Sequence, residues 1–369
     1  MHIDRGMSAW RSAVTLLLAA CLSVGFLLVP GCSSSTRNHD AVEQVVPETQ
    51  PEAQATAVAV DPLDGEAVED AGLINRRVLA VKIENDPAAR PQSGISDAEV
   101  VIEELVEGGI TRFICLFLAH ESPALGPNRS VRPTDIDILY FLQPLLICSG
   151  GAPQVMAMVK SSGLMYLEED ATHFWRDRKR TAPHNLYTNT QKLRQYLEER
   201  GDGEVPAVVS GLEFVREGDE AAEADGEGGL TRTVIPATTI EVPYESGCAV
   251  RYRYDPARGT YLRFVQGKPH TDLNNGAQLA PRNVILQYVQ LTSSGVKDVL
   301  GAESPNAMVV GRGRCAVFTG GEVIVGTWVK NDRNQATRYY DLLGREIGLN
   351  PGQTWIHLVP NELKTTFMP

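Results

Sequence analysis

The sequence predicts an α+β protein, with a mixed α/β N-terminal domain followed by a strand-dominated C-terminal domain. Three observations support this fold class. Between residues 74 and 210, apolar runs of strand length alternate with helical segments. Across residues 231–369, the apolar runs are short and rich in β-branched and aromatic residues. The two parts are separated by residues 211–230, an acidic stretch rich in Gly and Ala that is typical of a linker or a large exposed loop.

The chain begins with a short basic segment and an apolar run, residues 13–28, which predict a secretory signal over residues 1–31. The run ends in the letters LVPGC, which resemble a bacterial lipobox with Cys32 as the lipid-bearing first residue of the mature protein. A second lipobox ending at Cys21 would leave an apolar tail, and an uncleaved membrane anchor is the other alternative. We therefore predict a secreted lipoprotein, anchored to the outer face of the cell membrane by palmitate or a related lipid on Cys32.

Residues 32–73 predict a disordered acidic tether between the lipid and the folded part. They carry nine acids against one arginine, and the stretch Glu213 to Glu227 carries seven acids against one arginine. The whole chain has a net charge of −12. The excess of acids in these two segments accounts for that charge, so the folded remainder is close to neutral. We therefore expect no nucleic-acid partner, since such binders present a basic stripe.

A hairpin lies at the centre of the expected N-terminal domain. Two β-rich runs between residues 100 and 118 flank the Gly-Gly pair at 108–109, which predicts a two-residue turn. This register places Arg112 diagonally between Glu103 and Glu107 on one face of the sheet. Such a cluster either fixes the strand register or forms the polar floor of a binding site, and the sequence leaves both interpretations open.

A loop rich in Pro, Gly and Asn follows the hairpin and carries Arg129 and Arg132. Three residues apart between two prolines, these side chains could present two planar guanidinium groups to one carboxylate or phosphate. They could equally be solvated or pair with the glutamates of the hairpin.

Other elements of this part are a strand before the hairpin and three helices after it. A strand that ends at residue 148 runs into the letters SGG, a turn whose backbone N–H groups could hold an anion. No GK[ST] or GxSxG motif is present, so neither a nucleotide loop nor a hydrolase elbow is predicted. The expected bounds are 78–83 for the first strand, 144–148 for the later strand, and helices at 135–141, at 153–160 and from about 188 to 201.

Basic residues alternate with aromatic ones in residues 173–185, a pattern that can bind sugars or anionic polymers. Arg176 lies in this stretch, and so does His184, which is the best candidate for proton transfer because imidazole titrates near neutral pH. The alternative for His184 is a hydrogen bond that fixes the loop.

The sequence predicts neither a metal nor a cofactor. Four cysteines remain after processing, and none forms a CxxC pair; their spacing does not choose disulfide partners. The letters HTD at 270–272 have too few further ligand types nearby for a metal site. The cysteines are Cys115, Cys148, Cys248 and Cys315. Expected strands of the C-terminal domain are 239–242, 250–254, 261–265, 284–289, 307–310, 315–319, 323–330 and 355–358.

Several blocks occur in an order that resembles the YerB-like lipoprotein family. The blocks are VKIEND (81–86), ARPQSG (89–94), EGGITRF (107–113), GPNRSVRP (126–133), SGG (149–151), APHNLY (182–187) and GTW (326–328). The resemblance covers nearly everything from about residue 79 to residue 360. It implies a membrane-anchored envelope protein with two domains of unknown function and no established reaction. Asn128 departs from the pattern, since relatives are expected to have an apolar residue there.

We therefore expect a polar site, built mainly by the N-terminal domain, in which arginines outnumber glutamates and favour a carboxylate or phosphate. The first hypothesis is a non-catalytic binding module for an anionic or sugar-containing envelope ligand or a protein partner. The alternative is a hydrolase or transferase acting on cell-wall glycan or peptide, with His184 and Glu103 or Glu107 as acid and base. The candidate residues, expected to meet in one concave region, are Glu103, Glu107, Arg112, Arg129, Arg132, Arg176 and His184.

Overall fold

One mixed sheet of 11 strands contains segments of both expected domains. The computed structural model describes residues 59–201, 205, 208–215, 232–297 and 301–369. The strand order is β11-β20-β19-β16-β23-β4-β5-β3-β6-β7, with β21 also paired to β20. Its earlier strands are β3 (Leu79–Glu84), β4 (Val100–Leu105), β5 (Thr111–Phe117), β6 (Leu145–Cys148) and β7 (Met165–Glu168). Its later strands are β11 (Ile235–Pro236), β16 (Asn283–Val289), β19 (Gly311–Thr319), β20 (Glu322–Lys330), β21 (Arg338–Asp341) and β23 (Thr354–Pro360).

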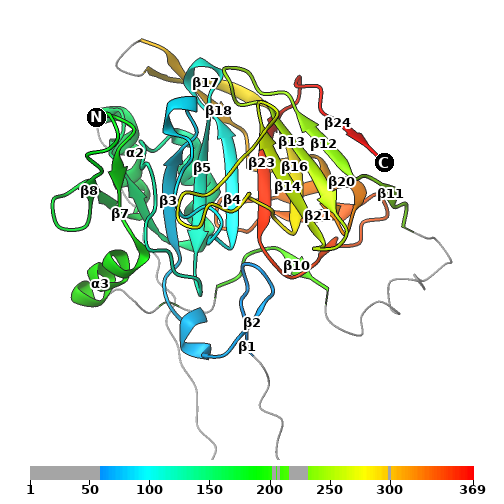
Figure 1. Cartoon of the computed structure of the whole chain (residues 1–369), viewed down its shortest axis with the longest axis horizontal. Helices are drawn as coiled ribbons and strands as arrows, with labels where there is room; N and C mark the ends of the chain where they lie inside the picture. Colours follow the sequence, from blue (N-terminus) through cyan, green and yellow to red (C-terminus); the bar gives the residue numbers. More distant parts are fainter. Residues whose placement is uncertain (1–58, 202–204, 206–207, 216–231, 298–300) are drawn as a thin grey trace, which may run out of the picture. The chain divides into compact units, whose positions relative to one another are not determined.

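Strand β23 joins the two halves of the sheet. It pairs in parallel with β16 on one side and with β4 on the other, and Figure 1 shows it in red beside the cyan β4. All of its residues are buried, as is usual for a parallel strand covered on both faces. The expected linker, 211–230, begins with β10 (Glu213–Phe214), which pairs with β22 (Gly348–Leu349), and residues 216–231 lie outside the described part. The boundary between two domains at this point stays a prediction.

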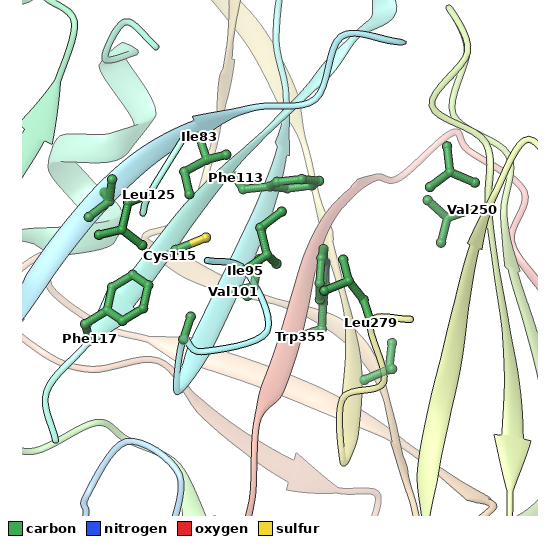
Figure 2. Packing of buried hydrophobic residues seen from close by; sticks show 14 of the residues in the cluster. Ile83, Ile95, Val101, Phe113, Cys115, Phe117, Leu125, Val250, Leu279 and Trp355 are labelled. Carbon is green, nitrogen blue, oxygen red and sulfur yellow. The ribbon is translucent and has the colours of Figure 1, made fainter. Parts of the chain in front are cut away.

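A second sheet packs on one face of the large sheet. Its order is β15-β14-β13-β12-β24, and its apolar residues join those of the large sheet in one core cluster. Figure 2 shows Trp355 of β23 near Phe113 of β5 within this cluster, and their rings meet edge to face with centroids 5.3 Å apart. The strands are β12 (Thr239–Val242), β13 (Val250–Asp255), β14 (Thr260–Val265), β15 (Lys268–Pro269) and β24 (Thr366–Met368).

Helices cover parts of both faces of the large sheet. The buried aliphatic residues of α1 (Pro133–Leu139) and α2 (Pro153–Ser162) belong to a second core cluster, on the face opposite Trp355. Helix α3 (Thr190–Arg200) places its buried leucines in the first cluster. Among the described residues, no helix is both long and apolar enough to cross a membrane. The remaining elements are β1 (Ala59–Val60), β2 (Ala67–Val68), β8 (Trp175–Arg176), β9 (Leu186–Tyr187), β17 (Leu291–Lys297), β18 (Glu303–Ala307) and the 3₁₀ turns η1 (Ala71–Ile74), η2 (Pro87–Ala89), η3 (Glu107–Gly109) and η4 (Tyr140–Leu142).

The predicted fold class is confirmed. The bounds of individual strands and helices differ from the predicted ones in detail. The strand expected at 307–310 is wrong, because β18 ends at Ala307 and pairs with β17. The four cysteines, Cys115, Cys148, Cys248 and Cys315, are free and buried.

The folded part also begins earlier than the predicted tether allows. Within residues 59–73, β1 pairs with β2, and Leu63 is buried against the second core cluster. The acidic composition misled the prediction, because Asp61 and Asp64 are buried rather than solvated. The predicted signal sequence, Cys32 and the rest of the predicted tether lie outside the described residues.

Candidate functional site

The hairpin between β4 and β5 has a register one residue away from the predicted one. Its connection includes Glu107, Gly108 and Gly109, and Val106 N–H donates to Ile110 O across it at 2.8 Å. Glu104 therefore lies opposite Arg112, and Glu103 opposite Phe113. Because neighbouring strand residues point to opposite faces, this shift places Glu104, not Glu103, on the face of Arg112.

Arg112 lies in the middle of this face, between β3 and β4. Its cross-strand neighbours are Glu84 on one side and Glu104 on the other. Its Nη1 donates to the carbonyl of Ser130 at 3.1 Å, and no carboxylate oxygen of the described residues lies within 4.0 Å of its guanidinium nitrogens. The predicted bridge from Arg112 to Glu103 and Glu107 is therefore wrong. Burial and the nearby Arg132 lower the pKa of Arg112 to about 10, so it stays charged at neutral pH.

Backbone hydrogen bonds hold the loop that carries the other arginines against β3. Arg129 N–H donates to Lys82 O at 3.0 Å, and Glu84 N–H donates to Pro127 O at 2.9 Å. On its other side the loop contacts the glycine turn after β6, where Val131 N–H donates to Gly150 O at 2.9 Å. The loop therefore runs across the end of β3 and presents its arginines to the Arg112 face.

Glu84 connects Arg129 and His184. Its Oε1 lies 2.6 Å from Arg129 Nη2, and its Oε2 accepts a hydrogen bond from His184 Nδ1 at 2.9 Å. Because a carboxylate accepts, Nδ1 carries the proton of this hydrogen bond. The Glu84 side chain is only 4% exposed, whereas that of His184 is 22% exposed. Sequence reasoning missed Glu84, although its alternation with Lys82 in a buried strand was a usable signal.

Arg132 pairs with Glu107. Its Nε and Nη2 donate to Glu107 Oε2 at 3.0 and 2.6 Å, and Ser304 of β18 donates its hydroxyl to Oε1. Burial raises the pKa of Glu107, but the hydrogen bonds and charge of Arg132 outweigh it and hold that pKa below its ordinary value. Glu107 therefore stays ionised and neutralises Arg132.

A buried triad lies on the same face as Arg112. Lys82 Nζ is 2.5 Å from Glu104 Oε1 and 2.9 Å from Asp135 Oδ1, and these three side chains are at most 2% exposed. Asp135 also accepts from the backbone N–H of Arg132 at 2.7 Å. Burial and the charge of Asp135 raise the pKa of Glu104 to about 8. At neutral pH Glu104 therefore keeps its proton, and the charges of Lys82 and Asp135 offset each other on the face of Arg112.

Glu103 belongs to a different network on the opposite face. Its Oε2 lies 2.9 Å from Arg263 Nη2 and accepts from Trp355 Nε1 at 3.1 Å, and both charged side chains are fully buried. Thr111 donates its hydroxyl to Oε1 at 2.7 Å. Glu103 therefore links β4 to β14 and β23 and does not join the other candidates.

Arg176 forms no hydrogen bond or ion pair with the other candidates among the described residues. It pairs with Glu169 at 2.6 Å, its side chain is 46% exposed, and its Nη1 donates to Asn185 Oδ1 at 2.9 Å. The structure thus connects five of the seven candidates. Glu84 holds Arg129 and His184, and Glu107 holds Arg132, on the side of the sheet that carries Arg112. We call this side the arginine face. Three guanidinium groups there meet two carboxylates, so the arginine face keeps a net positive charge.

The fold and this face define an α+β protein with a shared central sheet and an arginine-rich polar surface. The chain belongs to a family described as a protein of unknown function (DUF3048): its N-terminal domain matches residues 63–203 and its C-terminal domain residues 240–356. The chain is similar to "Putative lipoprotein YerB" of Bacillus subtilis (strain 168), with 28% identity over 361 residues and 96% of each chain covered. It is also similar to the crystal structure of YerB protein from Bacillus subtilis, with a TM-score of 0.69, 25% identity, and 84% of this chain and 100% of that chain covered.

Proposed function

We propose that this protein is an envelope lipoprotein, anchored through Cys32, whose folded part binds an anionic ligand at the arginine face. The predicted signal sequence and lipobox support the anchor. The location is supported by similarity, over 96% of this chain, to a relative named as a putative lipoprotein. The proposed ligand is a carboxylate or phosphate group of a cell-wall polymer, including one that carries sugars.

The observation that carries the proposal is the unmatched guanidinium of Arg112. A guanidinium has five N–H donors, and Arg112 uses one described hydrogen bond, to the carbonyl of Ser130. Arg129 and Arg132 are matched by Glu84 and Glu107, so the charge of Arg112 remains without a partner among the described residues. A partly buried cation without an anionic partner is costly in free energy. An anion that accepts hydrogen bonds from it would offset that cost.

A catalytic role has weaker support. Glu103 is buried with Arg263 on the other face, which removes it as an acid or base beside His184. The pairing of His184 with Glu84 does resemble the way a general base is oriented. Among the described residues, however, no hydroxyl or thiol is hydrogen-bonded to the His184 side chain. Hydrolysis or transfer of cell-wall material remains the alternative.

The test is retention of the purified full-length lipoprotein by isolated cell wall, with Arg112→Gln as the variant. Loss of charge-assisted hydrogen bonds worth about 1.5–3 kcal/mol should weaken retention by about 10-fold to 100-fold. Added salt should also weaken retention by the wild type. The matched control is Arg176→Gln, because Arg176 is exposed and already paired with Glu169.

Three outcomes would count against the proposal. Arg112→Gln retained as well as wild type, with an unchanged melting temperature, would remove the arginine face as the binding surface. Retention that disappears when the cell wall is first stripped of protein would point to a protein partner. Soluble fragments released by wild type but not by His184→Ala would favour the enzyme.

A further inference from the structure

Acidic side chains gather at a second place, where the loop between β1 and β2 meets the ends of β4 and β5. The loop covers residues 61–66 and is closed by two backbone hydrogen bonds of 2.8 Å, from Asp61 N to Glu66 O and from Gly65 N to Asp61 O. Glu99 directly precedes β4, and His120 lies three residues beyond β5. This group lies apart from the arginine face and contributes nothing to it.

Each of three buried carboxylates uses one oxygen to hold the backbone. Asp61 Oδ1 accepts from Leu63 N at 2.7 Å, and Asp64 Oδ1 accepts from Glu66 N at 2.9 Å. Glu99 Oε1 accepts from the N–H groups of Leu118 at 3.0 Å and His120 at 2.7 Å. These contacts fix the direction in which each second oxygen points.

The second oxygens have no such partner. Asp61 Oδ2, Asp64 Oδ2 and Glu99 Oε2 are buried and accept no hydrogen bond from the described residues. The three residues are at most 1% exposed. A buried carboxylate oxygen that accepts no hydrogen bond is costly to keep in a folded protein.

The imidazole of His120 is oriented as a metal ligand. Its Nδ1 lies 3.2 Å from the carbonyl of Asp97, which can only accept, so the proton lies on Nδ1. Nε2 is directed to the acids and lies 3.5 Å from Asp64 Oδ2. A hydrogen bond from one ring nitrogen to a carbonyl commonly orients a histidine whose other nitrogen binds a metal.

We propose that Asp64, Glu66 and His120 bind a first-row divalent cation such as Mn²⁺ or Zn²⁺. One ligand atom from each of these residues lies within 4.8 Å of the others, close enough for one ion to contact all three. Asp61 and Glu99 lie near them and add negative charge that a dication would offset. The nitrogen ligand favours these metals over Ca²⁺, which takes oxygen ligands.

The sequence prediction of no metal considered residues 270–272 and assigned 61–66 to the tether. The letters DPLDGE at 61–66 offered the signal, because three acids surround a turn glycine. Gly65 has φ +76°, and a Cβ there would lie 2.4 Å from the ring of Phe214, so the turn requires glycine.

The test is titration of the chelator-treated full-length protein with MnCl₂, followed by the electron paramagnetic resonance of free Mn²⁺ and by calorimetry. Manganese is the better probe because buried thiols do not compete for it as they do for zinc. We expect one saturable site per chain and a melting temperature that rises with Mn²⁺ concentration. His120→Ala and Asp64→Asn should each weaken binding at least tenfold. His173→Ala should bind like wild type, because His173 pairs with Asp170 outside this acidic group.

Several results would overturn the proposal. One is the absence of a saturable site in wild type. Another is an unchanged affinity in Asp64→Asn. Calcium bound more tightly than manganese, with His120→Ala unaffected, would remove the imidazole from the site. His120 is partly exposed, so its variant tests the site even if Asp64→Asn fails to fold.

Discussion

Replacement of Glu103 by glutamine should destabilise the folded protein by about 3–5 kcal/mol. Glu103 and Arg263 are both 0% exposed, and their ion pair is 2.9 Å long. Glutamine keeps the shape of the side chain but removes the charge, so Arg263 remains as a buried cation without a carboxylate. Glutamine keeps one acceptor oxygen, so it loses the hydrogen bond from Thr111 or from Trp355 but not both, at a cost of about 1 kcal/mol. The stranded charge therefore dominates the loss.

The assay is urea unfolding followed by tryptophan fluorescence, because Trp355 itself donates to Glu103. The matched control is Glu241→Gln, whose partner Arg251 is 54% exposed and whose ion pair should contribute less than about 1 kcal/mol. The double variant E103Q/R263M removes both charges and should lose less stability than the sum of the two single variants. If E103Q unfolds at the same urea concentration as E241Q, the Glu103 pair is not a buried link between the two sheets.

Three further predictions follow from other residues. Glu104 has a folded pKa of about 8, above its ordinary value near 4.5, so the folded state keeps a proton that the unfolded state releases. As the pH rises from about 5 to about 8, the free energy of unfolding of wild type should therefore fall by up to about 1.4 kcal/mol per pH unit relative to Glu104→Gln. Urea midpoints that change equally with pH in the two proteins would contradict this. Cys32→Ala should abolish acylation measured by fatty-acid labelling, whereas acylation lost only in Cys21→Ala would move the anchor. Arg176→Ala should change the free energy of unfolding by less than about 1 kcal/mol, because its ion pair with Glu169 is exposed. A larger loss in urea unfolding would show that the pair supports the loop.

Sequence reasoning located the elements around the site but not the faces of the strands. Charges within buried strands pointed to the hairpin, and Arg112, Arg129 and Arg132 do lie near one another in the structure. The turn contains one residue more than the Gly-Gly signal indicates, and a shift of one residue exchanges the faces of Glu103 and Glu104. Local turn chemistry cannot decide this, because the register depends on which side chains the rest of the protein covers.

Long-range partners were the other limit. Arg263 pairs with Glu103 and Ser304 contacts Glu107, although both partners lie more than a hundred residues away along the chain. Composition also misled where it was averaged over a long segment. Asp61 and Asp64 contribute to an acidic tract in the sequence, yet in the structure they are buried beside Glu99.

The central position of β23 has a consequence for the order in which this chain can fold. Thr354 pairs with Val100, so the strand that completes the middle of the sheet is made roughly 250 residues after its neighbour. Until then β4 has an open edge, ready to pair with any other extended chain. A chain released before residue 354 would leave both β4 and β16 without this partner, and it would aggregate rather than persist as a stable half.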